Sequence, residues 1–361
     1  MDIVSATRSY EAWLGKAIAV VDADLARKHA GMDESAFFFL RATYYRWAML
    51  WPEICPKLAR APKILAIGDL HLENFGTWRD AETRLIWGVN DFDETHQAAY
   101  ANDLVRLATS VLVAVEQGSL DIDGRKACAY ILEGYNQAIR GSDARPFVLE
   151  ELHTHLRALA MSEERNPKKF WKKLKSEEAD KPPAATRGVL DAHLPKGTSG
   201  VFFVRRVAGA GSLGAPRYVA IGLCDGSLVA REAKARAPSA FAWLSRGKAE
   251  PADYRTIIAR AVRAPDPFLH AGDDWLVRRL GPHNEGIDLV TVAQAHARRH
   301  VLSAMGSETA NIHRGNRAAL ARIRADLAGR KKSWLFDAAS DMSDALFADW
   351  KAWKKRAPSP S

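Results

Sequence analysis

The sequence predicts an α+β fold with a small antiparallel β lobe and a larger helical lobe. Apolar residues recur at helical spacing in the first fifty residues and again over Arg317–Trp353. Short runs rich in β-forming residues occur in two separate parts of the chain, and Gly-rich and Asp-Gly turns divide the later runs. These runs are Lys63–Ile67, Arg84–Val89, Val201–Ala208, Pro216–Leu223 and Ser227–Lys234.

The helical segments are expected mainly at the two ends of the chain. Two helices fill the first fifty residues: one carries the apolar positions from Tyr10 to Leu25, and the other spans Phe37–Trp51 until Pro52 and Pro56 end it. Further helical patterns cover residues 103–117, 124–140, 148–161, the region from 254 onward, 293–303 and 317–353. Residues 162–181 are dense in charge and lead into two prolines, which indicates a flexible insertion or a domain boundary.

The composition is that of a folded protein, with 47% apolar and 26% charged residues among 361. The formal net charge of +9 favours anionic ligands, but no nucleic-acid-binding signature accompanies it, so nucleic acid is not an expected partner. Cys55, Cys128 and Cys224 form neither a disulfide framework nor a zinc motif. No signal segment or long apolar run is present, so we expect a cytoplasmic protein without a membrane partner.

Asp69 follows a predicted strand in Gly68-Asp-Leu-His-Leu-Glu-Asn-Phe75, and Asn74 stands five positions after it. This is the D-x-x-x-x-N spacing of a kinase catalytic loop, in which the carboxylate orients the attacking hydroxyl and the amide oxygen holds a metal ion. Asp69 is therefore the candidate catalytic residue and Asn74 a candidate metal ligand. His71 is a second catalytic candidate, which is expected to bond the loop backbone, contact substrate or ligate the metal.

A predicted hairpin carries a second acidic motif back to Asn74. After the strand Arg84–Val89 the chain reads Asn90-Asp-Phe-Asp93, and Asp91 is expected beside Asn74 as a metal ligand, with Asp93 as the next choice. Glu73 and Glu94 are expected to be solvated. The plainer interpretation is that Asp69 and Asp91 merely cap strands.

Asp103 opens the helix that follows this motif. It is predicted either to be an ordinary N-terminal cap or to bond back to the catalytic loop and hold Asp69 in position. Both roles are structural.

The segment Gly209-Ala-Gly-Ser-Leu-Gly214 matches G-x-G-x-x-G, which dinucleotide folds and kinase phosphate loops share. A strand follows it here, so we expect the glycines to cap a hairpin as in kinases. Gly209, Gly211, Ser212 and Gly214 are the candidate phosphate-binding residues of this loop.

A further strand ends at Lys234, about twenty residues after the loop, where kinase folds place the lysine that binds the α and β phosphates. The alternatives are a plain tight turn and an exposed edge lysine. No acidic residue lies between Tyr254 and Pro265 to pair with Lys234, so Glu232, on the same face of the strand, is a possible substitute.

These parts occur in reversed order, because the glycine loop and lysine follow the catalytic loop instead of preceding it. The helix end at 293–298 resembles the one that precedes the catalytic loop in aminoglycoside phosphotransferase-type enzymes, and it too comes late in the chain. A circular permutation would account for the order, with the strand Trp275–Leu280 leading to the hinge between lobes.

The segments 68–76, 90–95, 103–110, 209–214 and 295–298, together with Lys234, resemble the bacterial family called domain of unknown function 2252. That family is itself similar to the protein-kinase-like and aminoglycoside phosphotransferase-like superfamily. The resemblance implies an ATP- and Mg²⁺-dependent phosphotransferase that acts on a hydroxyl of an unidentified small molecule. The sequence departs from the family in lacking the acidic residue after Lys234 and the glutamate of the helix near Tyr254.

The expected organisation follows from this resemblance. Residues 1–161 form the helical lobe with the catalytic loop and metal-binding hairpin, 162–200 a charged insertion or linker, 201–280 the nucleotide-binding β lobe, and 281–361 C-terminal helices that pack on the helical lobe. Two other functions stay open: a kinase-like module that binds nucleotide without turnover, and a metal-dependent phosphohydrolase suggested by Asp69-x-His71.

Overall fold

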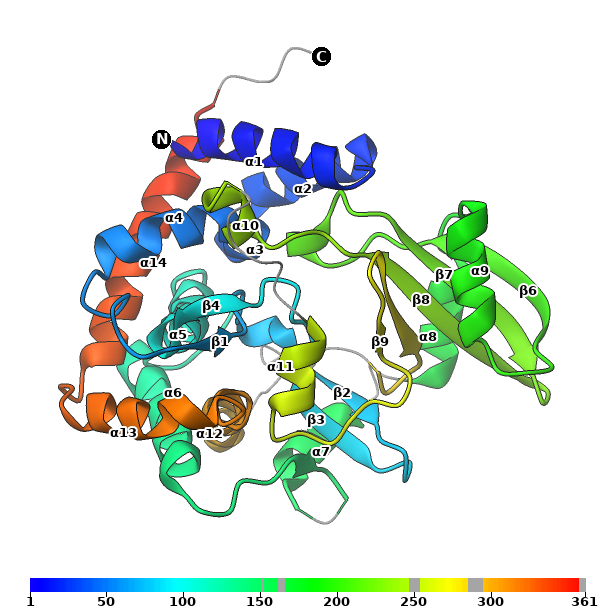
Figure 1. Cartoon of the computed structure of the whole chain (residues 1–361). Helices are drawn as coiled ribbons and strands as arrows, with labels where there is room; N and C mark the ends of the chain where they lie inside the picture. Colours follow the sequence, from blue (N-terminus) through cyan, green and yellow to red (C-terminus); the bar gives the residue numbers. More distant parts are fainter. Residues whose placement is uncertain (151, 162–165, 247–253, 285–294, 357–361) are drawn as a thin grey trace.

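The computed structural model describes residues 1–150, 152–161, 166–246, 254–284 and 295–356. It confirms an α+β fold with small antiparallel sheets. Figure 1 shows a helical part on one side of the molecule and a β-rich part on the other.

Four helices fill the first 54 residues, where two were expected: α1 (Ile3–Ala17), α2 (Asp22–Glu34), α3 (Ala36–Ala42) and α4 (Tyr44–Ile54). Capping explains the additional boundaries, because the side chains of Asp2 and Ser35 accept hydrogen bonds from the first turns of α1 and α3. Pro52 was expected to end a helix, but α4 continues through it to Ile54.

The centre of the helical part is a pair of long helices, α6 (Gly124–Arg140) and α12 (Ala295–His313), packed together with α5 (Tyr100–Glu116) in one hydrophobic core. Gly134 and Gly306 permit the close approach of α6 and α12, because a Cβ atom at either position would lie within 2 Å of a backbone oxygen of the other helix. The helices α13 (Leu320–Ala328) and α14 (Trp334–Lys354) complete this part. The expected helix over 148–161 is shorter, since the strand β5 (Phe147–Val148) precedes α7 (Thr154–Ala160).

Two small sheets hold the predicted catalytic segment. β1 (Lys63–Ala66) pairs antiparallel with β4 (His96–Ala99), a pairing that the sequence did not predict. β2 (Phe75–Arg79) and β3 (Leu85–Val89) form the predicted hairpin, and β5 adds a third strand to it. Two segments therefore lie side by side. One joins β1 to β2 and includes the short helix η1 (Leu72–Asn74), and the other follows β3.

The β-rich part is a five-stranded antiparallel sheet in the order β6-β7-β8-β10-β9. Its strands are β6 (Ser199–Arg205), β7 (Arg217–Cys224), β8 (Ser227–Ala235), β9 (His270–Ala271) and β10 (Trp275–Leu280). The glycine-rich segment joins β6 to β7 and contains the short helix η3 (Ala210–Ser212), so the predicted hairpin is present. Two short helices, α10 (Ala240–Leu244) and α11 (Tyr254–Arg260), follow β8.

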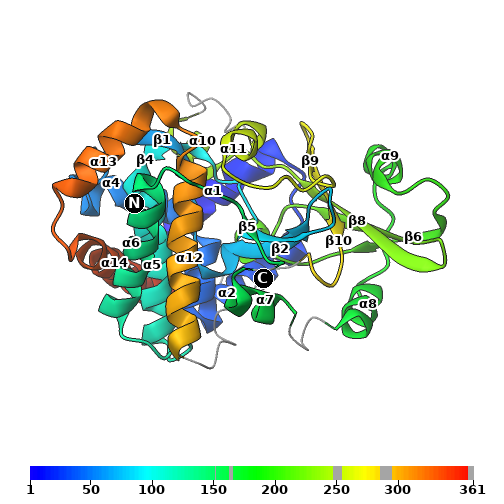
Figure 2. The ribbon, with the colours of Figure 1, turned by 90° about the horizontal axis from the view of Figure 1, so that it is seen from below.

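The range 162–200, expected to be a flexible charged insertion or linker, forms two helices over its described part, α8 (Pro167–Lys175) and α9 (Ala184–His193). Phe170 and Leu174 of α8 pack on one face of the five-stranded sheet, and Leu190 of α9 packs on the other. Figure 2 shows the two helices on opposite sides of the strands. The high lysine content misled the prediction because the lysines of α8 occupy only its solvent-facing side.

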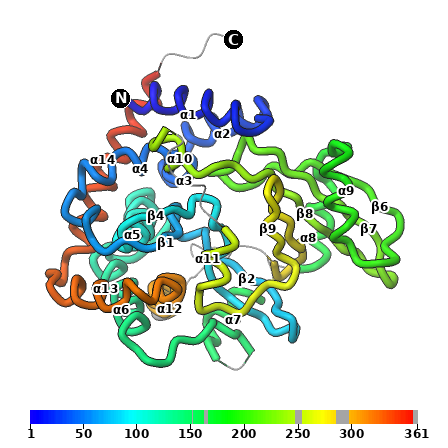
Figure 3. The backbone as a smooth tube through the Cα atoms, viewed as in Figure 1, coloured from blue at the N-terminus to red at the C-terminus, as the bar shows by residue number. Residues whose placement is uncertain are grey.

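The C-terminal helix α14 packs against the helices at the start of the chain. Arg46 donates to Asp349 in α14 (2.6 Å) and to the carbonyl of Met1 (2.8 Å), and Figure 3 shows the end of α14 beside the start of α1. Over the residues with a described position, no helix has the length and apolarity needed to cross a lipid bilayer.

Candidate functional site

The chain turns sharply at Gly68, directly before Asp69. Gly68 has a φ of 88°, and a Cβ atom there would lie 2.2 Å from the carbonyl oxygen of Glu94, so only glycine fits this turn. Asp103 accepts hydrogen bonds from the amides of Ile67 (2.7 Å) and Gly68 (3.0 Å). Of the two roles predicted for Asp103, the bond back to the catalytic segment is therefore confirmed and the N-cap is wrong, because Ala99 is the cap residue of α5.

Asp103 belongs to a buried series of hydrogen-bonded side chains. His313 of α12 lies with Nε2 3.0 Å from Asp103 Oδ2, and its Nδ1 lies 2.9 Å from the hydroxyl of Tyr135. Asp103 and His313 are fully buried. This series fixes the backbone before Asp69 to the core of the helical part.

Asp69 is oriented by an arginine that the sequence interpretation missed. Arg106, which is 1% exposed, donates from Nε and Nη2 to Asp69 Oδ1 at 3.0 and 2.8 Å. Burial raises the pKa of Asp69, and the charge of Arg106 opposes this shift. Arg106 stands three positions after Asp103, on the same side of α5, and this spacing was the signal available in the sequence.

Asn74 links the two acidic segments. Its Nδ2 donates to the carbonyls of Asp69 (3.0 Å) and Asp91 (3.2 Å), and its Oδ1 accepts from the amide of Asp91 (2.9 Å). The predicted hairpin thus brings Asp91 beside Asn74, although the amide oxygen proposed as a metal ligand already accepts one hydrogen bond.

Lys234 reaches across from β8 to the acidic motif. Its Nζ lies 3.0 Å from Asp91 Oδ2 and also forms an ion pair with Asp93 Oδ2. Against the effect of burial, the Lys234 ammonium lowers the pKa of Asp91 to about 2, whereas burial and the neighbouring Asp91 charge raise the pKa of Asp93. The structure therefore brings together Asp69, Asn74, Asp91, Asp93 and Lys234.

Glu232, proposed as a substitute partner for Lys234, pairs instead with three arginines. Its carboxylate lies 2.8 Å from Arg206, 3.1 Å from Arg217 and 2.8 Å from Arg278, and it is fully buried. Although burial opposes it, these guanidinium groups hold the pKa of Glu232 well below its usual range. Since one carboxylate cannot balance three guanidinium groups, positive charge remains in excess on this wall.

The glycine-rich loop lies close to Asp69. Gly209 and Gly214 have φ values of 80° and 102°, and Arg217 donates to the Ser212 hydroxyl at 2.8 Å. A Cβ atom at Gly211 would lie 3.5 Å from Asp69 Oδ2 and 3.0 Å from the carbonyl of Arg41. The loop therefore lies close to Asp69 and to the end of α3.

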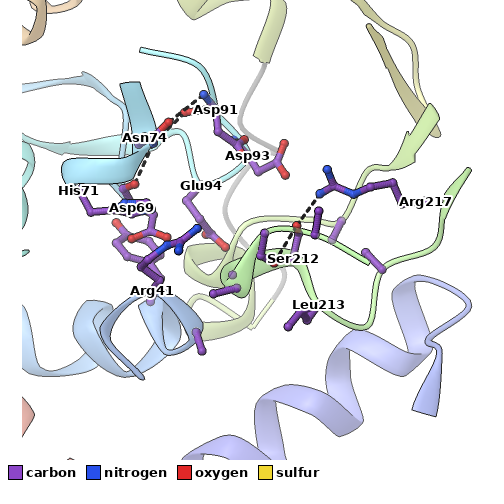
Figure 4. A pocket seen from close by; sticks show the side chains of 18 of the residues that line it. Arg41, Asp69, His71, Asn74, Asp91, Asp93, Glu94, Ser212, Leu213 and Arg217 are labelled. Carbon is purple, nitrogen blue, oxygen red and sulfur yellow. Dashed lines mark hydrogen bonds between the residues drawn. The ribbon is translucent and has the colours of Figure 1, made fainter. Parts of the chain in front are cut away.

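These groups surround a cavity of about 430 Å³ between the two parts of the molecule. Figure 4 shows Asp69, Asp91, Asp93 and Glu94 on one side of it, with Ser212 and Arg217 facing them. The carboxylates come from the helical part, which also contributes Arg41, whereas Arg206, Arg217 and Arg278 come from the side of the sheet. A ligand that contains both a phosphate chain and a divalent cation matches this separation of charge.

His71 lines the same cavity but is buried, and burial lowers its pKa well below the usual range. Its Nδ1 has no hydrogen-bond partner within the part of the chain that the structure describes. Glu73 is partly exposed and pairs with Arg41, in keeping with the prediction of a solvated side chain. Glu94 corrects that prediction, because it lines the cavity and accepts from the amide of Ala240 at 2.7 Å.

Two other segments lie elsewhere. The carbonyl of His283, in the segment after β10, accepts from Thr77 at 2.7 Å, which places this segment against β2. Residues 293 and 294 of the helix-end motif are outside the described residues, and the remainder begins α12.

Comparison with known proteins gives one match. The family described as an uncharacterized protein conserved in bacteria, domain of unknown function 2252, matches residues 21–190, which supports the family resemblance. This range includes Asp69, Asn74 and Asp91 but ends before the glycine-rich loop and Lys234. The searches found no similar curated protein and no similar solved structure.

Proposed function

We propose that this protein is an ATP- and Mg²⁺-dependent phosphotransferase with a kinase-like fold in circularly permuted order. The observation that carries the proposal is the ion pair of Lys234 with Asp91 and Asp93, two residues that line one cavity together with Asp69 and the glycine-rich loop. Phosphoryl transfer depends mainly on positioning and charge neutralisation, and these are the groups that it requires.

The donor set suits magnesium. Asp91 and Asp93 present carboxylate oxygens and Asn74 an amide oxygen, which are the hard ligands that Mg²⁺ prefers. Within the described residues no group of three or more His, Cys, Asp or Glu side chains is placed to hold a metal ion. Mg²⁺ is commonly bound by one or two carboxylates together with substrate phosphates and water. Held by Asp91, Asp93 and Asn74, the ion would neutralise charge on the phosphates.

The other residues divide into two roles. Arg217, Arg278 and the backbone of the glycine-rich loop, which line the cavity, would hold the phosphates together with Lys234, whose ammonium contacts Asp91 and Asp93. Asp69 would accept the proton of the acceptor hydroxyl. The oxygen of that hydroxyl would form a bond to the terminal phosphorus of ATP as the bond from this phosphorus to the β-phosphate oxygen breaks. Arg106 would keep Asp69 ionised and oriented.

A kinase-like module that binds nucleotide without turnover is the second candidate. The close packing of Gly211 beside Asp69 Oδ2 favours it, since an acceptor hydroxyl has to approach the same oxygen. The glycine-rich loop has to move away from Asp69 for transfer to occur.

The test is magnesium-dependent ATP binding followed by ATP consumption against a metabolite pool. Phosphotransfer requires ATP loss that depends on both magnesium and the pool, and Asp69→Asn should abolish this loss while ATP affinity changes less than about threefold. Asp121→Asn, on the exposed end of a loop, is the matched control. Binding without turnover selects the second candidate, and phosphate release from an aryl phosphate without ATP selects a phosphohydrolase.

A further inference from the structure

The carboxylate of Glu94 has a place in the cavity that the proposed chemistry does not use. Only one of its oxygens is engaged by the amide of Ala240. In the described ranges no lysine or arginine forms an ion pair with Glu94, so its other carboxylate oxygen can accept a hydrogen bond from a ligand in the cavity.

Tyr44 supplies a second unsatisfied group in the same cavity. The residue is 4% exposed, and its hydroxyl makes no hydrogen bond within the part of the chain described here. A Cβ atom at Gly68 would lie 3.0 Å from the Tyr44 hydroxyl and 2.2 Å from the backbone carbonyl oxygen of Glu94. The Tyr44 hydroxyl and the backbone of Glu94 are therefore both close to Gly68. A buried hydroxyl without a partner costs on the order of 1–3 kcal/mol, so a ligand that bonds to it gains affinity.

Apolar side chains also line the cavity: Tyr10 and Leu14 of α1, Tyr45 of α4 and Leu213 of the glycine-rich loop. The rings of Tyr10 and Tyr45 are stacked, with their centroids 4.4 Å apart. The cavity thus has an apolar part in addition to its acidic and basic groups.

We propose that Glu94 and Tyr44 form the acceptor subsite, and that the acceptor is an alcohol with a hydrogen-bond donor, either an amine or a second hydroxyl, next to the hydroxyl that is phosphorylated. The inference rests on the proposed phosphotransferase function, because Asp69 then defines where the reacting hydroxyl lies. Glu94 accepts from the neighbouring donor, and Tyr44 bonds to the same group. An alcohol with a carboxylate or phosphate at that position is disfavoured by repulsion from Asp69 and Asp91, which line the same cavity.

Two matched sets of probes test this. Ethanolamine, ethylene glycol and glycolate share a hydroxymethyl group and differ in the neighbouring group; 2-aminocyclohexanol, cyclohexane-1,2-diol and 2-hydroxycyclohexanecarboxylate repeat the comparison on a ring. Binding of each is measured by ligand-observed magnetic resonance to protein loaded with magnesium and a non-hydrolysable ATP analogue. In at least one set, the amine or hydroxyl probe should bind at least tenfold more tightly than the carboxylate probe.

Substitution then distinguishes the two donors. If the natural acceptor carries an amine, Glu94→Gln should weaken binding of the amine probe at least tenfold and binding of the hydroxyl probe less than threefold. If the natural acceptor carries a second hydroxyl, the substitution should weaken binding of both probes by a few fold. Tyr44→Phe should weaken the bound probe a few fold without lowering stability. Glu133→Gln, an exposed change on α6, should alter neither.

Three outcomes would overturn the inference: equal or tighter binding of the carboxylate probes, no binding of any probe, or no effect of Glu94→Gln on probe binding. These outcomes are separate from a failure of the proposed function, which appears earlier as absence of magnesium-dependent binding of the ATP analogue.

Discussion

The ammonium group of Lys234 lies 3.0 Å from the carboxylate of Asp91, although 143 positions of sequence separate the two residues. The hydrogen bond joins the five-stranded sheet to the segment after the β2–β3 hairpin, beside the cavity that Asp91 lines. An ion pair that is removed from water contributes little net stability, because desolvation offsets the attraction. Under the proposed function both residues bind one ligand, and this would account for the pair.

Lys234→Met should weaken MgATP binding by about tenfold to a hundredfold, since a charge-assisted contact to the phosphates is lost. Adenosine binding should change less than threefold, because adenosine carries no phosphate. Calorimetric titration of both ligands checks this, with exposed Lys351→Met as the control. Equal losses for the two ligands would show that Lys234 acts through the fold and not through phosphate.

Gly211→Ala should reduce turnover about tenfold or more while changing stability by less than about 1 kcal/mol. The added methyl group would lie 3.0 Å from the Arg41 carbonyl and 3.5 Å from Asp69 Oδ2, so it occupies the approach to Asp69. Gly188→Ala, where nothing lies within 4 Å, is the control. Full activity of Gly211→Ala in steady-state kinetics would refute the placement of the loop over Asp69.

Asp103→Asn should lower the free energy of unfolding by about 3 kcal/mol, because two backbone amides and His313 lose a buried charged partner. Turnover should fall as well, since the turn before Asp69 is released. Urea denaturation measures the first effect. A loss below about 0.5 kcal/mol would mean that Asp103 does not anchor this turn.

Stability should decrease as the pH rises from about 5 to 8. Burial raises the pKa of Glu308 from 4.5 to about 7, so the folded protein holds a proton there that the unfolded chain has released. This contribution to the free energy of unfolding is fully present below the pKa of Glu308 in the unfolded chain. It is lost as the pH rises through the pKa of Glu308 in the folded protein, and it amounts to roughly 3 kcal/mol. Glu308→Gln should flatten this part of the curve in denaturation measured at each pH, and an unchanged slope would contradict the assignment.

The parts of the site that the sequence predicted are those set by short-range spacing. Asp69 and Asn74 share one turn, the β2–β3 hairpin returns Asp91 to them, and the glycines stand between two paired strands. In each case local chain geometry decides the position, and sequence alone contains that information.

The missed residues depend on contacts between distant elements. Arg106 reaches Asp69 only because α5 packs beside the turn at Gly68, and the Tyr44 hydroxyl lies near Gly68 only because α4 packs against the same turn. Arg278 and Glu232 are direct partners across β10 and β8, a register that no local pattern fixes. The order of helices and strands was therefore largely predictable, whereas the charge arrangement around the cavity was not.

The most direct test of the central claim is a calorimetric titration of the wild-type protein with ATP, with magnesium and with excess chelator, repeated on Asp91→Asn. The shared site predicts one ATP per chain, binding at least tenfold tighter with magnesium, and loss of this magnesium effect in Asp91→Asn. Absence of ATP binding, or a magnesium effect that survives Asp91→Asn unchanged, would contradict the account.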